Sequence, residues 1–274
     1  MLEPAVTVGE STSGVPPRIA VRGDAGDIAA AFPVLAGLEP IAWIPDGLVL
    51  APFAGGRDQG EQAARLSALD LPWQPEPGPS PPLPFPAAVG GGVYRRSPGH
   101  APAPAGLPEI VLVAGEGFGL AEHPTTGMCL DLLPALPDGH ALDAGCGSGT
   151  LALAWARLGR GAVVAVDLDP RAVAQARESA WASGLDARVT VRRGPLGALT
   201  AGAIDGRVVM ANAPLPAQLG LLGVAGDPVP TALLLSGLQP DAMDEVTAVW
   251  SQRGLHEVRR EGMGRWQAAV LMTA

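Results

Sequence analysis

A glycine-rich turn follows an apolar run near the middle of the chain. The segment "LDAGCGSG", residues 142–149, passes through Asp143 and then places glycine at positions 145, 147 and 149. Glycine adopts positive φ angles without strain and lets a ligand approach the main chain closely. Such a turn between a strand and a helix is typical of sites that bind adenosine-containing cofactors, and its spacing separates three candidate ligands.

The spacing favours S-adenosylmethionine over the two alternatives. A phosphate-binding P-loop requires a lysine, and all 18 Lys and Arg residues of this chain are arginine. A dinucleotide fingerprint requires Gly-x-Gly-x-x-Gly. If Gly145 is its first glycine, the third glycine should stand at position 150, which is Thr150. The observed order, Gly145-x-Gly147-x-Gly149 after an acidic strand end, suits a ligand without a pyrophosphate. We therefore expect S-adenosylmethionine to lie across this turn.

Two polar residues at the ends of later predicted strands support the same ligand. Asp167 stands 24 residues after Asp143, close to the distance at which an acid reaches the ribose hydroxyls of adenosine. Asn212 ends the strand in "VVMAN" and is expected at the same edge of the sheet, where it would orient an amine and the methyl donor. The alternative for each residue is a cap on a turn. Leu215 offers no stacking surface after Asn212, which disfavours a nucleobase or a glutamine amide as acceptor.

Strands and helices are expected to alternate around these residues. The strand candidates are 109–113, 140–145, 162–169, 187–191, 206–212 and 232–237, and the helix candidates are 126–136, 150–159 and 170–184. Asp169 is placed as N-cap of the last helix, with Pro170 at its first position and Gly184 past its end. The alternation predicts an α/β fold: a doubly wound, Rossmann-like sheet that binds ligands at the carboxyl ends of parallel strands.

Two further regions precede this domain, which is expected to cover 109–274. Residues 1–70 read as β-α-β-β-α with a hairpin turn at 45–47, which is most of a small ferredoxin-like α+β domain. Residues 71–108 are crowded with proline and glycine and show no period, so we expect a linker or an extended arm. Within it, residues 94–96 either contact a partner or pack the linker onto the body.

The composition argues against several other classes of function. The formal net charge is −9 and no run of arginine exceeds two residues, which argues against direct binding of nucleic acid and suits a basic partner. Two cysteines make neither a disulfide framework nor a metal cluster, so no metal is expected. The start lacks the basic segment of a signal peptide, and no apolar stretch is long enough to span a bilayer. We expect a cytoplasmic protein without membrane contact, with a monomer favoured.

Longer segments around the turn show a specific resemblance. "GEGFGLAEHPTTGMCLDLL" followed by "ALDAGCGSGTLALAWARLG" resembles the ribosomal protein L11 methyltransferase family (PrmA-type), in which a Phe-Gly-Thr-Gly-x-His-x-Thr-Thr segment precedes the cofactor domain. The matching positions here are Phe118, Gly119, His123, Thr125 and Thr126. The similarity is specific over residues 109–274 and weak in the N-terminal region.

The resemblance implies transfer of methyl groups from S-adenosylmethionine to amines of a basic ribosomal protein of the large subunit, at lysine side chains and the terminal amine. By matching position, the residues that it implies in holding the cofactor are Thr126, Gly145, Gly147, Asp167 and Asn212. Asn212 is also the candidate for positioning the amine. His123 either takes part in catalysis or organises its loop. The N-terminal domain would recognise the substrate.

Two departures from the family pattern leave the identity of the substrate open. Leu120 and Ala121 replace the Thr-Gly that precedes the histidine, and the linker lacks the Trp-containing motifs of the family. Both changes fall on parts that face the substrate. The alternatives are therefore a diverged methyltransferase of another protein or a small molecule, and a non-catalytic cofactor-binding module that acts as a sensor or scaffold.

Overall fold

The computed structural model contains two compact units, Met1–Leu83 and Pro84–Ala274. The residues that it describes are 18–22, 38–44, 47–52, 73–76, 88–98, 100–115, 117–120, 123–199, 204, 206–224 and 229–274. Within these ranges, each helix is too short or too polar to cross a membrane.

The first unit contains a four-stranded antiparallel sheet in the order β2-β3-β1-β4. Its strands are β1 (Arg18–Arg22), β2 (Leu38–Ile44), β3 (Gly47–Pro52) and β4 (Trp73–Glu76). The predicted hairpin is confirmed, since β2 pairs with β3. The two helices predicted in this unit lie outside the described residues. Strand β4 lies in the segment predicted as linker, so the sheet of this unit extends past residue 70.

A small three-stranded sheet opens the second unit. Strand β5 (Ala88–Gly90) pairs antiparallel with β6 (Val93–Arg96), which pairs parallel with β7 (Glu109–Val111). The expectation of a linker without strands over 71–108 is therefore wrong here. Its glycines make the hairpin turn, because Gly91 and Gly92 have φ angles of 58° and 78°. The Arg96 guanidinium is buried and pairs with the Glu109 carboxylate at 3.0 Å, so it packs the segment onto the body of this unit.

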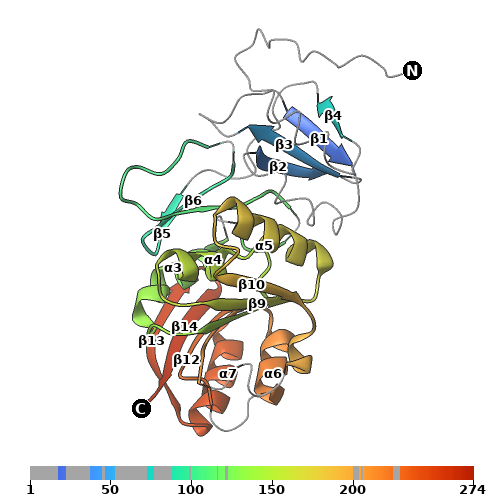
Figure 1. The fold of residues 1–274 in the computed structure, drawn as a ribbon. Coiled ribbons are helices and arrows are strands. Elements are labelled where there is room, and N and C mark those ends of the chain that lie inside the picture. The colour runs from blue at the N-terminus through green and yellow to red at the C-terminus, as the bar shows by residue number, and fades with distance from the viewer. Residues whose placement is uncertain are drawn as a thin grey trace, which may run out of the picture. The chain divides into compact units, whose positions relative to one another are not determined.

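The main sheet has seven strands in the order β10-β9-β8-β11-β12-β14-β13 (Figure 1). Its strands are β8 (Ala141–Ala144), β9 (Val163–Asp167), β10 (Val189–Arg193), β11 (Val208–Asn212), β12 (Ala232–Leu238), β13 (Leu255–Met263) and β14 (Trp266–Thr273). The first five run parallel, which confirms the Rossmann-like prediction. Strands β13 and β14 were not predicted; they extend the sheet at one edge, where β14 runs antiparallel to both β12 and β13. The strand order reverses between β8 and β11, and ligands of such sheets bind at this switch point.

Five helices cover the two faces of this sheet (Figure 1). They are α3 (Pro124–Leu132), α4 (Thr150–Arg157), α5 (Pro170–Ala182), α6 (Leu215–Val224) and α7 (Pro240–Gln252), with 3-10 turns at η1 (Leu133–Ala135) and η2 (Leu196–Ala198). The predicted caps of α5 are confirmed: Asp169 accepts a hydrogen bond from the Arg171 backbone N–H, and Gly184 has a φ of 64°. Helix α3 begins two residues earlier than predicted, with His123 as its N-cap.

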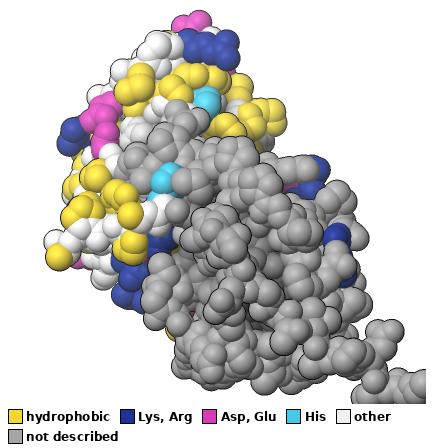
Figure 2. All heavy atoms as spheres, turned by 90° about the horizontal axis from the view of Figure 1, so that it is seen from above, with side chains coloured by type: hydrophobic (Ala, Val, Ile, Leu, Met, Phe, Trp, Pro, Cys, Tyr) yellow, Lys and Arg dark blue, Asp and Glu magenta, His cyan; other side chains and the backbone are white. Residues whose placement is uncertain are grey.

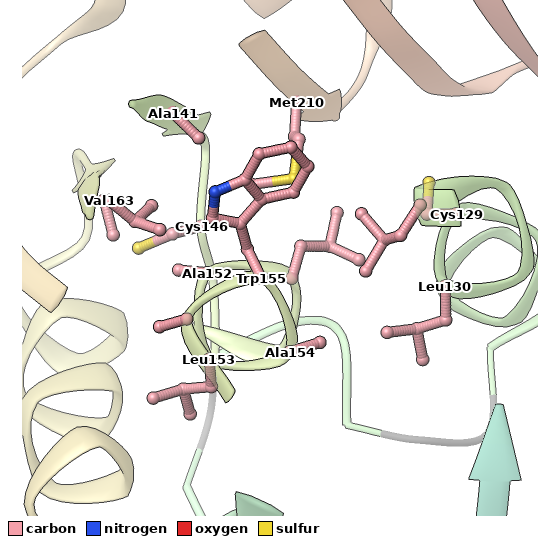
Figure 3. Close-up of a cluster of buried hydrophobic side chains, with 14 of the residues drawn as sticks. Cys129, Leu130, Ala141, Cys146, Ala152, Leu153, Ala154, Trp155, Val163 and Met210 are labelled. Carbon is pink, nitrogen blue, oxygen red and sulfur yellow. The ribbon is translucent and has the colours of Figure 1, made fainter. Parts of the chain in front are cut away.

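Alternation along the strands builds a separate apolar core on each face of the main sheet. On β11, Val208 and Met210 join the core under α3, α4 and α5, whereas Val209 and Ala211 join the core under α6 and α7. The indole of Trp155 projects from α4 toward Met210 and is fully buried (Figure 3). The strands are apolar on both sides because helices cover both faces.

The surface of the second unit mixes side-chain types. Figure 2 shows arginines of the described residues in separate groups, with acidic and apolar side chains between them. The described part of this face therefore has no continuous basic stripe.

Candidate active site

A cleft of about 820 Å³ opens at the carboxyl ends of β8, β9 and β11, at the switch point of the sheet. Of the predicted site residues, those that line it are His123, Gly145, Gly147, Asp167 and Asn212. Thr126 lines a small adjoining cavity, whose wall also includes Gly145 and Asn212. The structure thus brings all six predicted residues together at one edge of the main sheet.

The glycine turn has the geometry that its sequence predicts. Gly145, Gly147 and Gly149 have φ angles of 79°, 52° and 83°, which favour glycine. A Cβ atom on Gly147 would lie 2.2 Å from the carbonyl oxygen of Phe118, which also accepts a hydrogen bond of 2.8 Å from the Ser148 N–H. The segment before α3 therefore packs directly on the turn, and only glycine fits at position 147.

Asp167 ends β9 with its carboxylate fixed by two backbone donors. The Gly147 N–H donates to Oδ2 at 2.8 Å, and the Asp169 N–H donates to Oδ1 at 2.9 Å. One bond comes from the glycine turn and the other from the residues that start α5. Each oxygen keeps a further lone pair, so the carboxylate can accept from two adjacent hydroxyls of a ligand.

Asp143, the acid before the glycine turn, is buried at the end of β8. It accepts a hydrogen bond of 3.0 Å from the Ala152 N–H in the first turn of α4. Burial raises its pKa to about 7, the neighbouring Asp167 adds to the rise, and the hydrogen bond from Ala152 opposes it. Because the folded pKa lies above the unfolded one, the native state binds more protons between these two pKa values. Stability therefore falls as the pH rises through this window and levels off above it.

We expect Asp143→Asn to remove this pH dependence. The amide oxygen can still accept from Ala152, but the side chain no longer ionises. The free energy of unfolding of the variant minus that of wild type should therefore rise by about 2 to 3 kcal/mol as the pH goes from roughly 5 to roughly 8. Chemical denaturation at both pH values measures this gain. The exposed Asp186→Asn is the control and should show none, and an equal gain in both variants would contradict the assignment to Asp143.

Asn212 and Thr126 come from different elements and meet in the wall of the small adjoining cavity. Asn212 Nδ2 donates to Thr126 Oγ1 at 3.4 Å, which joins the end of β11 to the first turn of α3. Asn212 Oδ1 is buried and has no hydrogen-bond partner among the described residues. A buried acceptor left unpaired costs about 1 to 3 kcal/mol, so a ligand N–H at this position would be stabilised.

His123 organises the loop before α3. Its Nδ1 lies 2.7 Å from Thr125 Oγ1 and caps the helix. Its ring makes edge contacts with Phe118 at 4.9 Å and with Trp266 at 5.5 Å between centroids. This geometry favours the loop-organising alternative for His123, because Nδ1 is engaged within the cap.

Sequence reasoning missed four parts of the cleft wall: Leu168, residues 195–197, residues 216, 217 and 220 in the first half of α6, and Trp266. Leu168 has a signal in the sequence, because it is an apolar residue directly after the strand-end acid. In the structure its side chain is 64% exposed. Residues 195–197 follow β10, whose end was placed two residues too early. Trp266 begins β14, a strand that was not predicted.

The switch-point cleft and its glycine turn define a Rossmann-like fold of the class that binds nucleoside cofactors. A crystal structure of a ribosomal protein L11 methylase from Lactobacillus delbrueckii subsp. bulgaricus shares this fold, with a TM-score of 0.53 and 19% identity over 67% of this chain and 96% of that chain. Residues 101–273 match the family model described as "Ribosomal protein L11 methyltransferase (PrmA)". The chain belongs to the ribosomal protein L11 methyltransferase family.

Individual relatives carry the same description. A ribosomal protein L11 methyltransferase of Dechloromonas aromatica is 39% identical over 160 residues, which are 55% of this chain and 50% of the relative. One of Gloeobacter violaceus is 47% identical over 100 residues, which are 36% of this chain and 31% of the relative. The chain spans about half the length of the curated relatives that it matches.

Proposed function

We propose that the protein binds S-adenosylmethionine in this cleft and transfers its methyl group to amines of a ribosomal protein of the large subunit. The observation that carries the proposal is the convergence of three groups on one cleft: the glycine turn, the Asp167 carboxylate and the unpaired Asn212 amide oxygen. The family to which the chain belongs supports the same reaction.

The residues of the cleft fit this cofactor. The Asp167 carboxylate would accept from the ribose hydroxyls, and Leu168 beside it offers an apolar surface to the adenine. Gly145 and Gly147 leave the main chain open to the amino-acid part, and Thr126 and Asn212 would hold its far end. When bound, the cofactor supplies a methyl group on a sulfonium, which is already activated for transfer.

The chain's own residues then position the acceptor and exclude water. An ammonium has no lone pair, so the acceptor amine must lose its proton before transfer. A partly desolvated cleft lowers the pKa of an amine and favours the neutral form. Asn212 Oδ1 accepts one of the remaining N–H groups and turns the lone pair toward the methyl group. Water takes the released proton.

Three features support a ribosomal protein as substrate. The relatives are named for this reaction, and the net charge of −9 suits a basic partner. The first unit would be the recognition domain, and its strand order β2-β3-β1-β4 is compatible with the ferredoxin-like fold that we assign to it. A ribosomal substrate would place the reaction in the cytoplasm.

Incubation of the purified protein with methyl-labelled S-adenosylmethionine and ribosomal large-subunit proteins tests the proposal. We expect label on one ribosomal protein, in residues identified by mass spectrometry as methylated amines. Label only on other components of a cell extract would point to a diverged methyltransferase. Donor binding by calorimetry without any transfer would point to a sensor or scaffold.

Asp167→Asn should weaken donor binding by about 10- to 100-fold, because the variant loses a charged acceptor for the ribose hydroxyls. Calorimetric titration with S-adenosylmethionine or its demethylated product measures this loss. Asp186→Asn is the control: it makes the same charge change at an exposed residue that does not line the cleft. Its dissociation constant should stay within about threefold of wild type. Equal losses in the two variants would show a general charge effect and contradict the role of Asp167.

A further inference from the structure

A buried glutamine lies in α6, the helix that follows Asn212 and contributes to the wall of the cleft. Gln218 is in α6, is 1% exposed and is not among the residues that line the cleft, although its helix neighbours Ala217 and Gly220 are. Its amide nitrogen donates to two main-chain carbonyls, Ala213 O at 2.8 Å and Ser236 O at 2.7 Å. One amide thus joins the residues at the ends of β11 and β12.

The Ala213 carbonyl directly follows Asn212, the proposed amine-positioning residue, and the Ser236 carbonyl belongs to the neighbouring strand β12. Asn212 pairs with Ser236 in the sheet, and the N–H of Ala213 donates to the same Ser236 carbonyl at 3.1 Å. From the other side, Gly237 approaches so closely that a Cβ atom on it would lie 2.8 Å from Ala213 O. Ala213 is therefore held between Gly237 and the amide of Gln218.

The side chain of Asn212 is held only loosely by comparison. Within the described part of the chain, its one hydrogen bond runs from Nδ2 to Thr126 Oγ1 at 3.4 Å, at the long end of the range. Its direction therefore depends on the main chain at residues 212 and 213, and Gln218, which does not line the cleft, donates to the Ala213 carbonyl of that main chain.

We propose that Gln218 is a positioning residue that sets the direction of the Asn212 amide through the carbonyl of Ala213. This inference rests on the proposed function. The cost of burying Gln218 supports this role. Its Oε1 is buried and has no hydrogen-bond partner among the described residues, so the amide is kept at this position despite a loss of stability. A methionine or leucine would fill the same space without that cost, so the two donated bonds are what the amide contributes.

The experiment compares wild type with Gln218→Met, which keeps the length of the side chain and removes both donors. Asn212 is the chain's only asparagine, so side-chain ¹⁵N labelling of asparagine gives one amide pair that reports its direction. We expect this pair to shift in Gln218→Met, the single-turnover rate to fall at least about tenfold, and donor affinity to stay within about threefold. Ser183→Ala is the control, because it removes a buried hydroxyl that bonds the β7 backbone away from the cleft. It should leave the resonance and the rate unchanged.

A wild-type resonance and rate in a folded Gln218→Met would overturn the proposal, and so would equal shifts in Ser183→Ala. If Gln218→Met does not fold, Gln218→Glu decides, because its protonated form can donate to one carbonyl and its ionised form to neither. The Asn212 resonance of that variant should then move toward wild type as the pH falls, and a resonance that ignores pH would overturn the proposal. The resonance decides even if the wild-type protein transfers no methyl group, a result that would refute the proposed function alone.

Discussion

Replacing Gly147 with alanine should abolish measurable binding of S-adenosylmethionine and lower the free energy of unfolding by more than about 2 kcal/mol. The added Cβ would lie 2.2 Å from the carbonyl oxygen of Phe118 and 3.0 Å from its carbon, both main-chain atoms that cannot rotate away. The φ of 52° at this position adds strain for any residue with a side chain. Relief requires the segment before α3 to separate from the turn, which breaks the bond from Ser148 to Phe118. Chemical denaturation and calorimetry measure the two effects.

Gly159→Ala separates the clash from the cost of the backbone angle. Gly159 also has a left-handed φ, 77°, but apart from its own chain neighbours no atom of the described residues lies within 4 Å of where its Cβ would be. We expect a loss of only about 1 kcal/mol and unchanged donor binding. If Gly147→Ala bound the donor within threefold of wild type, the close packing of residues 117–119 on the turn would not be required for the site.

The parallel part of the main sheet could be predicted because its strands are buried on both faces. Val163–Asp167 is apolar up to its last residue, Asp167, and Ala232–Leu238 begins with four apolar residues before Ser236 and Gly237. Strand β13 lacks that signal, since it is an edge strand with mostly exposed residues and a register shift between Glu257 and Arg259. The strands β5 and β6 were missed because proline and glycine dominate the local composition, although the glycines make the turn between them.

The site was predicted to the extent that its chemistry follows from strand ends. Gly145, Asp167 and Asn212 each come at the end of a parallel strand, and such ends share one edge of the sheet. Trp266 could not be placed in this way, because an antiparallel strand brings its first residue, not its last, to that edge. Gln218 is in a helix that was not predicted, and its two bonds reach Ala213 and Ser236, which lie in different segments of the sequence and come together only in the folded structure.

Asn212→Ala should lower the single-turnover rate of methyl transfer by about 100-fold at saturating donor. The variant loses the acceptor that directs the lone pair of the amine, while Asp167 and the glycine turn still hold the adenosine end. Donor affinity should therefore fall by less than about tenfold. Rapid-quench measurement with the acceptor identified in the labelling experiment gives the rate, and calorimetry gives the affinity. Gln252→Ala, which removes an exposed amide at the end of α7, should leave both unchanged.

The direction of a pH shift distinguishes orientation of the amine from simple filling of the cleft. Asn212→Asp keeps an oxygen at the same place but adds a negative charge, which stabilises the ammonium form of the acceptor and raises its pKa. The pH–rate profile of this variant should move to higher pH, whereas Asn212→Ala should lower the rate without moving the profile. An amine that does not contact residue 212 would give the wild-type profile in both variants. A profile that moves only in Asn212→Asp would therefore locate the reacting nitrogen beside this side chain.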